Sequence, residues 1–163
     1  MSEPGYPLAE LVSVRTLRET TASREVSVAQ LALEEAQAKV LRAKEEHKSY
    51  IAWRIEEEKI SYEKVMNQQI HLAELETLKQ EIRGLREREV DLQEAIIEEE
   101  KKVEECATAL GEAKVLHQRA VRDLEKLHEH RQVWESERAA VVARKEEDEM
   151  DDFRVASAVV FED

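Results

Sequence analysis

The sequence predicts an all-α protein folded as a long antiparallel two-helix coiled-coil hairpin. Charged residues make up 39% of the 163 residues and aromatic residues only 4%, with three glycines and two prolines. This composition is typical of long helices. Apolar residues recur at alternating steps of three and four in both halves of the chain, which is the repeat of a coiled coil. Because the phase of the repeat changes near the middle, we expect two helices that bury their apolar stripes against each other.

The first helix is expected over residues 8–65, after an N-terminal lead-in at residues 1–7. Both prolines precede it, and Pro7 suits a first helical turn because its missing N–H would have no partner there. Beyond Tyr50 the strict repeat is lost, so we expect the supercoil to relax. A separate upstream stripe has a shifted phase and is expected to join the same seam. The main stripe is Ala22, Val26, Ala29, Leu33, Ala36, Val40, Ala43, His47 and Tyr50, and the upstream stripe is Leu8, Leu11, Val14 and Leu17.

A turn is predicted at residues 66–71, where the two repeats meet. Asn67 tolerates the left-handed conformation that often ends helices. His71 with Glu74 resembles a capping box in which His replaces Ser or Thr. The alternative is one continuous helix that dimerises in parallel. Continuing the first repeat past Tyr50 reaches only polar or charged residues, namely Arg54, Glu57, Ser61 and Lys64.

The second helix is expected over residues 72–150, followed by a flexible C-terminal tail at residues 151–163. The tail is predicted from the acidic run between Glu146 and Asp152, because acidic groups at a helix C-terminus oppose the dipole and favour fraying. The stripe of the second helix is mostly apolar. It comprises Leu75, Leu78, Ile82, Leu85, Glu89, Leu92, Ile96, Glu99, Val103, Cys106, Leu110, Ala113, His117, Ala120, Leu124, Leu127, Arg131, Trp134, Arg138 and Val141.

Charge and cysteine content restrict the class of protein. The net charge is −13, which disfavours nucleic-acid binding because phosphate contacts need clustered Lys and Arg. No apolar run approaches the roughly 18 residues that span a bilayer, so no direct membrane insertion is expected. Cys106 is the single cysteine, which excludes an internal disulfide and suggests a reducing compartment. The N-terminus has no secretory signal, and we expect a cytoplasmic protein.

No motif predicts catalysis, a cofactor or a metal site. Glu125 and His128 have the Glu-x-x-His spacing of di-iron helices, but such a site needs two of these motifs within a four-helix bundle. The sequence contains no Gly-rich phosphate loop and no nucleophile motif. A two-helix hairpin also lacks the concave pocket of an enzyme. We therefore expect a protein that is not an enzyme and that uses no cofactor.

The two tryptophans are candidate anchors for a binding partner. Trp134 lies on the second stripe at a point that the first helix is too short to cover, and Trp53 lies where the repeat loosens. Exposed tryptophans are disproportionately binding anchors. Packing against the other helix is the alternative for both.

Four stretches carry a resemblance to a known family. They are YPLAELVSVRTLRE from Tyr6, YIAWRIEEEKISYEKVM from Tyr50, LAELETLKQEIRGLRERE from Leu72 and WESERAAVVARKEEDEMDDF from Trp134. Together they resemble the YscO proteins of bacterial type III secretion over nearly the whole chain. From this resemblance we expect a serine before LAELETL, where the chain has His71.

The resemblance implies a two-helix stalk like the flagellar FliJ protein and the shaft of rotary ATPases. Such a stalk sits in the hexameric type III secretion ATPase, stimulates it and links it to the cytoplasmic domain of the export gate. Members of the family also bind export chaperones. The resemblance further implies a monomeric hairpin, a location at the cytoplasmic face of the bacterial inner membrane and a role in virulence. By analogy with rotor shafts, residues 8–24 and 124–144 form the end that enters the ring.

Two other functions stay open. One is an escort protein that binds export chaperones or substrates through the uncovered part of the second helix. The other is a generic homodimeric coiled-coil scaffold. The candidate partner-binding residues are Trp53, Arg54, Trp134, Arg15 and Arg18.

Overall fold

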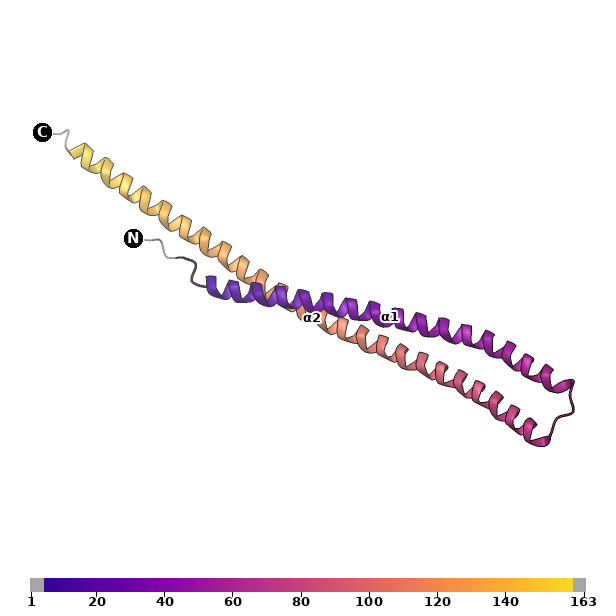
Figure 1. The fold of residues 1–163 in the computed structure, drawn as a ribbon. Coiled ribbons are helices and arrows are strands. Elements are labelled where there is room, and N and C mark those ends of the chain that lie inside the picture. The colour runs from indigo at the N-terminus through magenta and orange to yellow at the C-terminus, as the bar shows by residue number, and fades with distance from the viewer. Residues whose placement is uncertain (1–4, 160–163) are drawn as a thin grey trace. The chain divides into compact units, whose positions relative to one another are not determined.

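The computed structural model describes residues 5–159 and contains two long helices joined by a short loop (Figure 1). Helix α1 spans Ala9–Met66 and helix α2 spans Leu72–Val159. The helices pack against each other in opposite directions, so the predicted all-α antiparallel hairpin is confirmed. Within the described residues there is no strand, and no helix is apolar over a sufficient length to cross a membrane.

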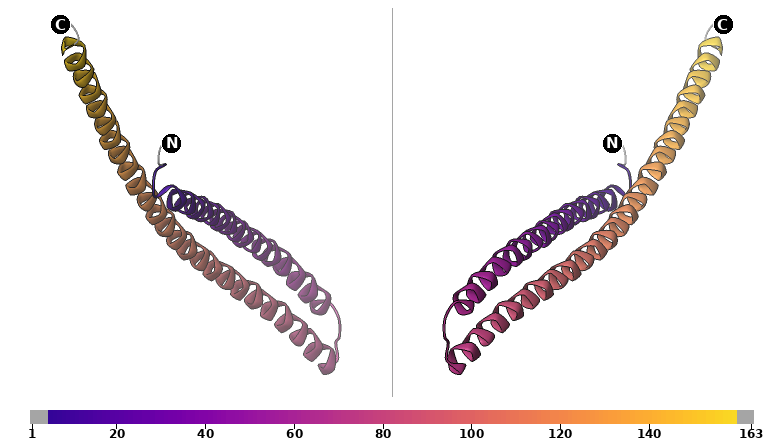
Figure 2. Two further views of the ribbon diagram at one scale, coloured as in Figure 1. Left: turned by 90° about the vertical axis from the view of Figure 1, so that its left-hand side faces the viewer. Right: turned by 90° about the vertical axis from the view of Figure 1, so that its right-hand side faces the viewer.

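The chain forms two compact units, which are described separately. The terminal unit pairs residues 5–24 with residues 114–159, and the loop unit comprises Glu25–Ala113. In the loop unit the two helices lie side by side, and residues 67–71 connect them at one end (Figure 2).

The core of the loop unit is a single seam between the facing stripes of the two helices. Side chains at the predicted stripe positions are buried or partly buried, whereas those between them are mostly exposed. Ala36 on α1 and Ile82 on α2 are both 7% exposed. No described side chain is less than 2% exposed. The seam is therefore one layer deep, and every residue lies close to solvent.

The seam continues past Tyr50 although the apolar repeat does not. Arg54, Glu57 and Ser61 are partly buried and Glu58 is 8% exposed, so this face of α1 still packs on α2. Helix pairing therefore persists beyond Tyr50, because charged side chains that neutralise one another replace the apolar ones.

Half of a capping box begins α2. The N–H of His71 donates to a carboxylate oxygen of Glu74 at 3.1 Å, and the N–H groups of Glu74 and Leu75 donate to the carbonyl of His71. Histidine is tolerated here because the Glu half of the box needs only a backbone N–H from the capping residue. Asn67 does not adopt the left-handed conformation, since no non-glycine residue in the described range has a positive φ.

Helix α2 runs to Val159 rather than ending near Met150. Residues 151–159 contain neither glycine nor proline, so the backbone has no reason to stop there. The unfavourable interaction between an acidic group and the helix dipole is worth only about 0.3–1 kcal/mol, and extending an existing helix is cooperative. The prediction of a flexible tail is therefore wrong as far as Val159, and residues 160–163 lie outside the described residues.

Candidate partner-binding surfaces

Two polar pairs join α1 to α2 in the terminal unit. Arg15 Nη1 donates to Asp123 Oδ2 at 2.8 Å, and Glu19 Oε1 lies 2.9 Å from His117 Nε2. The Arg15 side chain is 31% exposed and that of Asp123 34%. A pair this exposed contributes at most about 1 kcal/mol to stability. Arg15, a candidate partner-binding residue, is thus engaged within the chain.

The first turns of α1 present apolar side chains to solvent. Leu11, Val14 and Leu17 are 39%, 46% and 66% exposed, so the expectation that this stripe joins the seam is wrong. The face that packs on α2 is set by the main apolar repeat, and continuing that face toward the N-terminus reaches Arg15 rather than Leu17. Arg18 is four residues after Val14 and is also exposed, on the same side of the helix.

Tyr6, from the segment before α1, partly covers Trp134. Tyr6 is 8% exposed, and its ring centroid lies 5.5 Å from that of Trp134 in an edge-to-face arrangement. The Tyr6 hydroxyl lies 2.8 Å from Nδ1 of His130. The sequence predicts that the first helix is too short to cover Trp134, and the residue that packs on it is Tyr6, which precedes α1. The sequence signal is an aromatic residue between Gly5 and Pro7, directly before a helix.

An open cavity of about 540 Å³ lies beside this aromatic pair. Tyr6, Trp134 and Val142 supply apolar lining. The guanidinium carbons of Arg131 and Arg138 lie 5.9 Å and 5.6 Å from the ring centroids of Tyr6 and Trp134, respectively. Cation–π contacts at exposed sites are worth about 0.5–1 kcal/mol. Since Trp134 stays partly exposed, this surface offers both aromatic and cationic groups to a partner.

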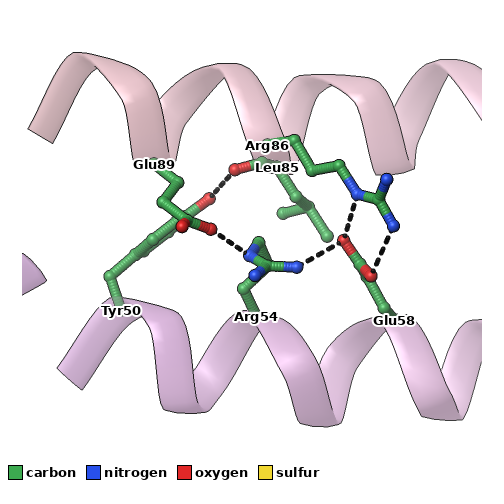
Figure 3. Close-up of polar contacts among 6 residues, drawn as sticks. All are labelled: Tyr50, Arg54, Glu58, Leu85, Arg86 and Glu89. Carbon is green, nitrogen blue, oxygen red and sulfur yellow. Dashed lines mark hydrogen bonds and ion pairs between the residues drawn. The ribbon is translucent and has the colours of Figure 1, made fainter. Parts of the chain in front are cut away.

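In the loop unit, Arg54 belongs to a four-residue ionic cluster between the helices (Figure 3). Its guanidinium pairs with Glu58 on α1 at 2.9 Å and with Glu89 on α2. Arg86 donates through Nε and Nη2 to the two carboxylate oxygens of Glu58, at 3.1 Å and 3.2 Å. The side chains of Arg54 and Glu58 are only 15% and 11% exposed. Charges this well covered persist because each has opposite charges beside it.

The cluster shifts the pKa values of its members in opposite directions. Hydrogen bonds from Arg86 and Arg54 lower the pKa of Glu58, against the smaller opposing effect of burial. The hydrogen bond with Glu58 raises the pKa of Arg54. Both groups therefore remain charged at neutral pH.

Trp53 is an accessible aromatic residue of this region. It is 50% exposed, and its ring centroid lies 5.5 Å from that of Tyr50. Tyr50 in turn donates its hydroxyl to the carbonyl of Leu85 on α2, at 2.9 Å. Trp53 and Arg54 are neighbours in the sequence but lie on different sides of α1, so only Trp53 presents a surface to a partner.

The structure brings the five candidates together only in part. Arg15, Arg18 and Trp134 belong to the terminal unit, and Trp53 and Arg54 belong to the loop unit. Within each unit, the exposed candidates are Arg18, Trp134 in part, and Trp53.

Sequence reasoning missed three charged residues around Arg54, namely Glu58, Arg86 and Glu89. A signal for Glu89 was available. Arg54 and Glu89 both occupy positions where the repeat requires an apolar residue, they lie on different helices, and their charges are opposite. Two such departures predict an ion pair across the seam.

The described residues contain no group of three or more His, Cys, Asp or Glu side chains that could hold a metal ion. Glu125 and His128, the residues with di-iron spacing, are both exposed on α2. The exposed groups of the two units include apolar, aromatic and cationic side chains.

Comparison with known proteins identifies the family. The family model of the type III secretion protein YscO matches residues 8–156. The chain belongs to the YscO family. The crystal structure of YscO from Vibrio parahaemolyticus is similar at 29% identity, covering 90% of this chain and 92% of that one, with a TM-score of 0.81. A putative YscO homolog from Chlamydia trachomatis is 19% identical over 97% of both chains, with a TM-score of 0.77, and shows the same fold. No curated protein sequence matches significantly.

Membership of the YscO family confirms the resemblance seen in the sequence. It makes the chain a type III secretion protein whose partners belong to the secretion apparatus. YscO proteins are structural or accessory components of that apparatus and are not known as enzymes.

Proposed function

We propose that this YscO protein is the central stalk of a type III secretion ATPase. It sits in the hexameric ring, stimulates hydrolysis and links the ring to the cytoplasmic domain of the export gate. The observation that supports this most directly is an antiparallel pair of long helices in a chain of the YscO family. The comparison with the shafts of rotary ATPases is an analogy between folds.

The terminal unit is the part that we propose enters the ring. It exposes Leu11, Val14 and Leu17 on α1, with Arg18 on the same side. Exposed apolar side chains that are not scattered singly mark interaction sites. A two-helix stalk has no six-fold symmetry, so its contacts differ from one ATPase subunit to the next. Such a difference favours one subunit interface over the others and couples hydrolysis to export.

The loop unit is the part that we propose faces the export gate. Trp53 is one of its accessible aromatic residues, and Arg54 acts through the ionic cluster rather than by touching a partner. As part of the same proposal, the protein acts at the cytoplasmic face of the bacterial inner membrane as a monomeric hairpin, in a system that serves virulence.

The hydrolysis rate of the cognate secretion ATPase, measured with and without this protein, tests the proposal. We expect stimulation by the parent protein and weaker stimulation by a variant with Leu11→Ser, Val14→Ser and Leu17→Ser. The matched control replaces Val28 and Leu31 with serine, since these α1 residues of the loop unit are 67% and 65% exposed. The proposal would be refuted if the parent protein neither bound the ATPase nor stimulated its hydrolysis rate.

A second candidate function is an escort that binds export chaperones or substrates. The cavity beside Tyr6 and Trp134 supports it, because aromatic and arginine side chains are the commonest interface anchors. For this function, Trp134→Ala should abolish chaperone capture in a pull-down while ATPase stimulation stays intact. Parallel loss of both activities would argue for a single binding surface, and no loss of capture would exclude the cavity.

Light scattering tests the proposed monomer against a homodimeric scaffold. The monomer has a mass of 18.9 kDa, and a scaffold would show twice that value. A dimeric mass at every concentration would reject the monomeric stalk.

A further inference from the structure

Two faces of α1 compete for α2 in the stretch between Tyr50 and Met66. The face that packs on α2 carries Tyr50, Arg54, Glu58, Ser61 and Val65, which are all buried or partly buried. Only two of these residues are aromatic or aliphatic. The face therefore follows the register of the preceding seam and not the local distribution of apolar residues.

The neighbouring face is the more apolar one. It carries Ile51, Ile55, Tyr62 and Met66, spaced by four, seven and four residues as the contacts of a helical stripe are. Ile55, Tyr62 and Met66 are 55%, 49% and 83% exposed. A cavity of about 650 Å³, lined in part by these three side chains, lies open beside them. Because successive residues are about 100° apart around a helix, a turn of less than one residue step would bring this face toward α2.

Apolar burial alone favours that turn, since it would remove isoleucine and tyrosine side chains from water. The contacts that oppose it belong to the observed face. Arg54 reaches Glu89 across the seam, and Arg86 reaches back to both oxygens of Glu58. Rotating α1 would carry Arg54 away from α2 and leave Glu89 without this cation.

We propose that the cluster of Arg54, Glu58, Arg86 and Glu89 is an orienting device that holds residues 51–66 of α1 with the charged face inward and the apolar face outward. Buried polar groups of this kind add little net stability, and their best-attested role is to fix the register of helices. The cluster keeps Ile55, Tyr62 and Met66 at the surface, because the alternative orientation of α1 would break its ion pairs.

The test compares two triple variants with the parent chain. The neutral variant carries Arg54→Gln, Glu58→Gln and Glu89→Gln, which removes three of the four charges of the cluster, and with them all its ion pairs, but keeps polar side chains on the observed face. The apolar variant carries leucine at the same three positions, which favours the observed face by burial instead of charge. The matched control carries Lys44→Gln and Glu100→Gln, which removes an exposed ion pair between the helices, with side chains 53% and 48% exposed.

Two readouts report the orientation of α1. Hydroxyl-radical oxidation of Tyr62 measures the exposure of the apolar face. Thiol labelling of Ser61→Cys, in a Cys106→Ser background, measures the exposure of the observed face. In the neutral variant we expect Tyr62 oxidation to fall about threefold and Cys labelling at position 61 to rise about tenfold. The apolar variant and the control should behave like the parent.

Three outcomes would overturn the proposal. The first is a neutral variant that keeps the parent pattern at both positions. The second is a rise at both positions together with a loss of helical circular dichroism, because the cluster would then only stabilise the pair of helices. The third is a reversed pattern in the apolar variant, because burial on the observed face would then fail to hold the orientation.

Discussion

Replacing Tyr6 tests how the segment before α1 is held on α2. Tyr6→Ala removes a ring that is 8% exposed and that contacts His130, Trp134 and Arg131. Truncating a buried aromatic side chain in a core costs about 3–5 kcal/mol. This site borders an open cavity, so neighbouring groups can relax into water, and we expect a loss of about 2–3 kcal/mol from the stability of the terminal unit.

Tyr6→Phe separates the ring from the hydroxyl. It removes the hydroxyl's contacts with Nδ1 of His130 at 2.8 Å and with the carbonyl of Leu127 at 3.5 Å, and should cost about 0.5–1.5 kcal/mol. Urea unfolding followed by the fluorescence of Trp134, in a Trp53→Phe background, measures both losses. Because Tyr6 packs on Trp134, Tyr6→Ala should also shift the native emission of Trp134 to longer wavelength.

A Tyr6→Ala variant with the same urea midpoint as the parent protein and unchanged Trp134 emission would show that Tyr6 does not hold this segment on α2. If Tyr6→Phe lowered the stability as much as Tyr6→Ala, the ring would contribute nothing. Val133→Ala is a suitable control, since Val133 lies on α2 beside Trp134 in the sequence and is 57% exposed. This control should change the stability by less than about 0.5 kcal/mol.

Two further predictions concern the helices themselves. Gly84→Ala and Gly111→Ala should each stabilise the protein by about 0.5–1 kcal/mol, because an added Cβ would meet nothing within 4 Å at either position; thermal melting of both variants measures the gain, and a lowered melting temperature would contradict it. The pKa of Glu58 is lowered from 4.5 by Arg86 and Arg54, so its stabilising effect is present above that value and is lost as the pH falls through the folded-state pKa. Urea midpoints of the parent should therefore drop between about pH 5 and pH 3. Glu58→Gln should reduce that drop while lowering the stability at pH 7. Equal acid sensitivity of the two proteins would show that ionised Glu58 does not stabilise the fold.

The seam of α2 was predictable because its apolar residues coincide with the face that packs. From Leu75 to Leu127 the repeat in the sequence and the buried side of the helix agree. Where apolar residues are frequent and regularly spaced, burial decides the register without competition.

Pattern reading fails at both ends of α1. Near its start, Leu11, Val14 and Leu17 are apolar but exposed, and beyond Tyr50 the packed face is charged. Near the start of α1 the packed face continues the buried main stripe, and beyond Tyr50 the packed face carries the ionic cluster proposed to hold it there. A local count of apolar residues cannot detect either effect, because it takes no account of the neighbouring turns of the helix or of ion pairs with α2.

The residue types of the candidate site were predictable from the sequence. Their exposure and their ion pairs within the chain were less so. Trp134 and Trp53 were identified as aromatic anchors and are accessible to different degrees. Arg15 and Arg54 were identified by charge, but each has an acidic partner on α2 that lies far away in the sequence. Such pairs need the alignment of the two helices, which the repeat alone does not specify to within one residue.

A seam one layer deep separates two sets of positions that can change independently during evolution. Substitutions on the outward faces meet only solvent, so they alter what the protein recognises without altering how its helices pair. This fits a relative that is 29% identical with a TM-score of 0.81. A secretion system can thus adapt its YscO protein to new partners by exchanging surface residues, while a few inward-facing positions keep the pair of helices aligned.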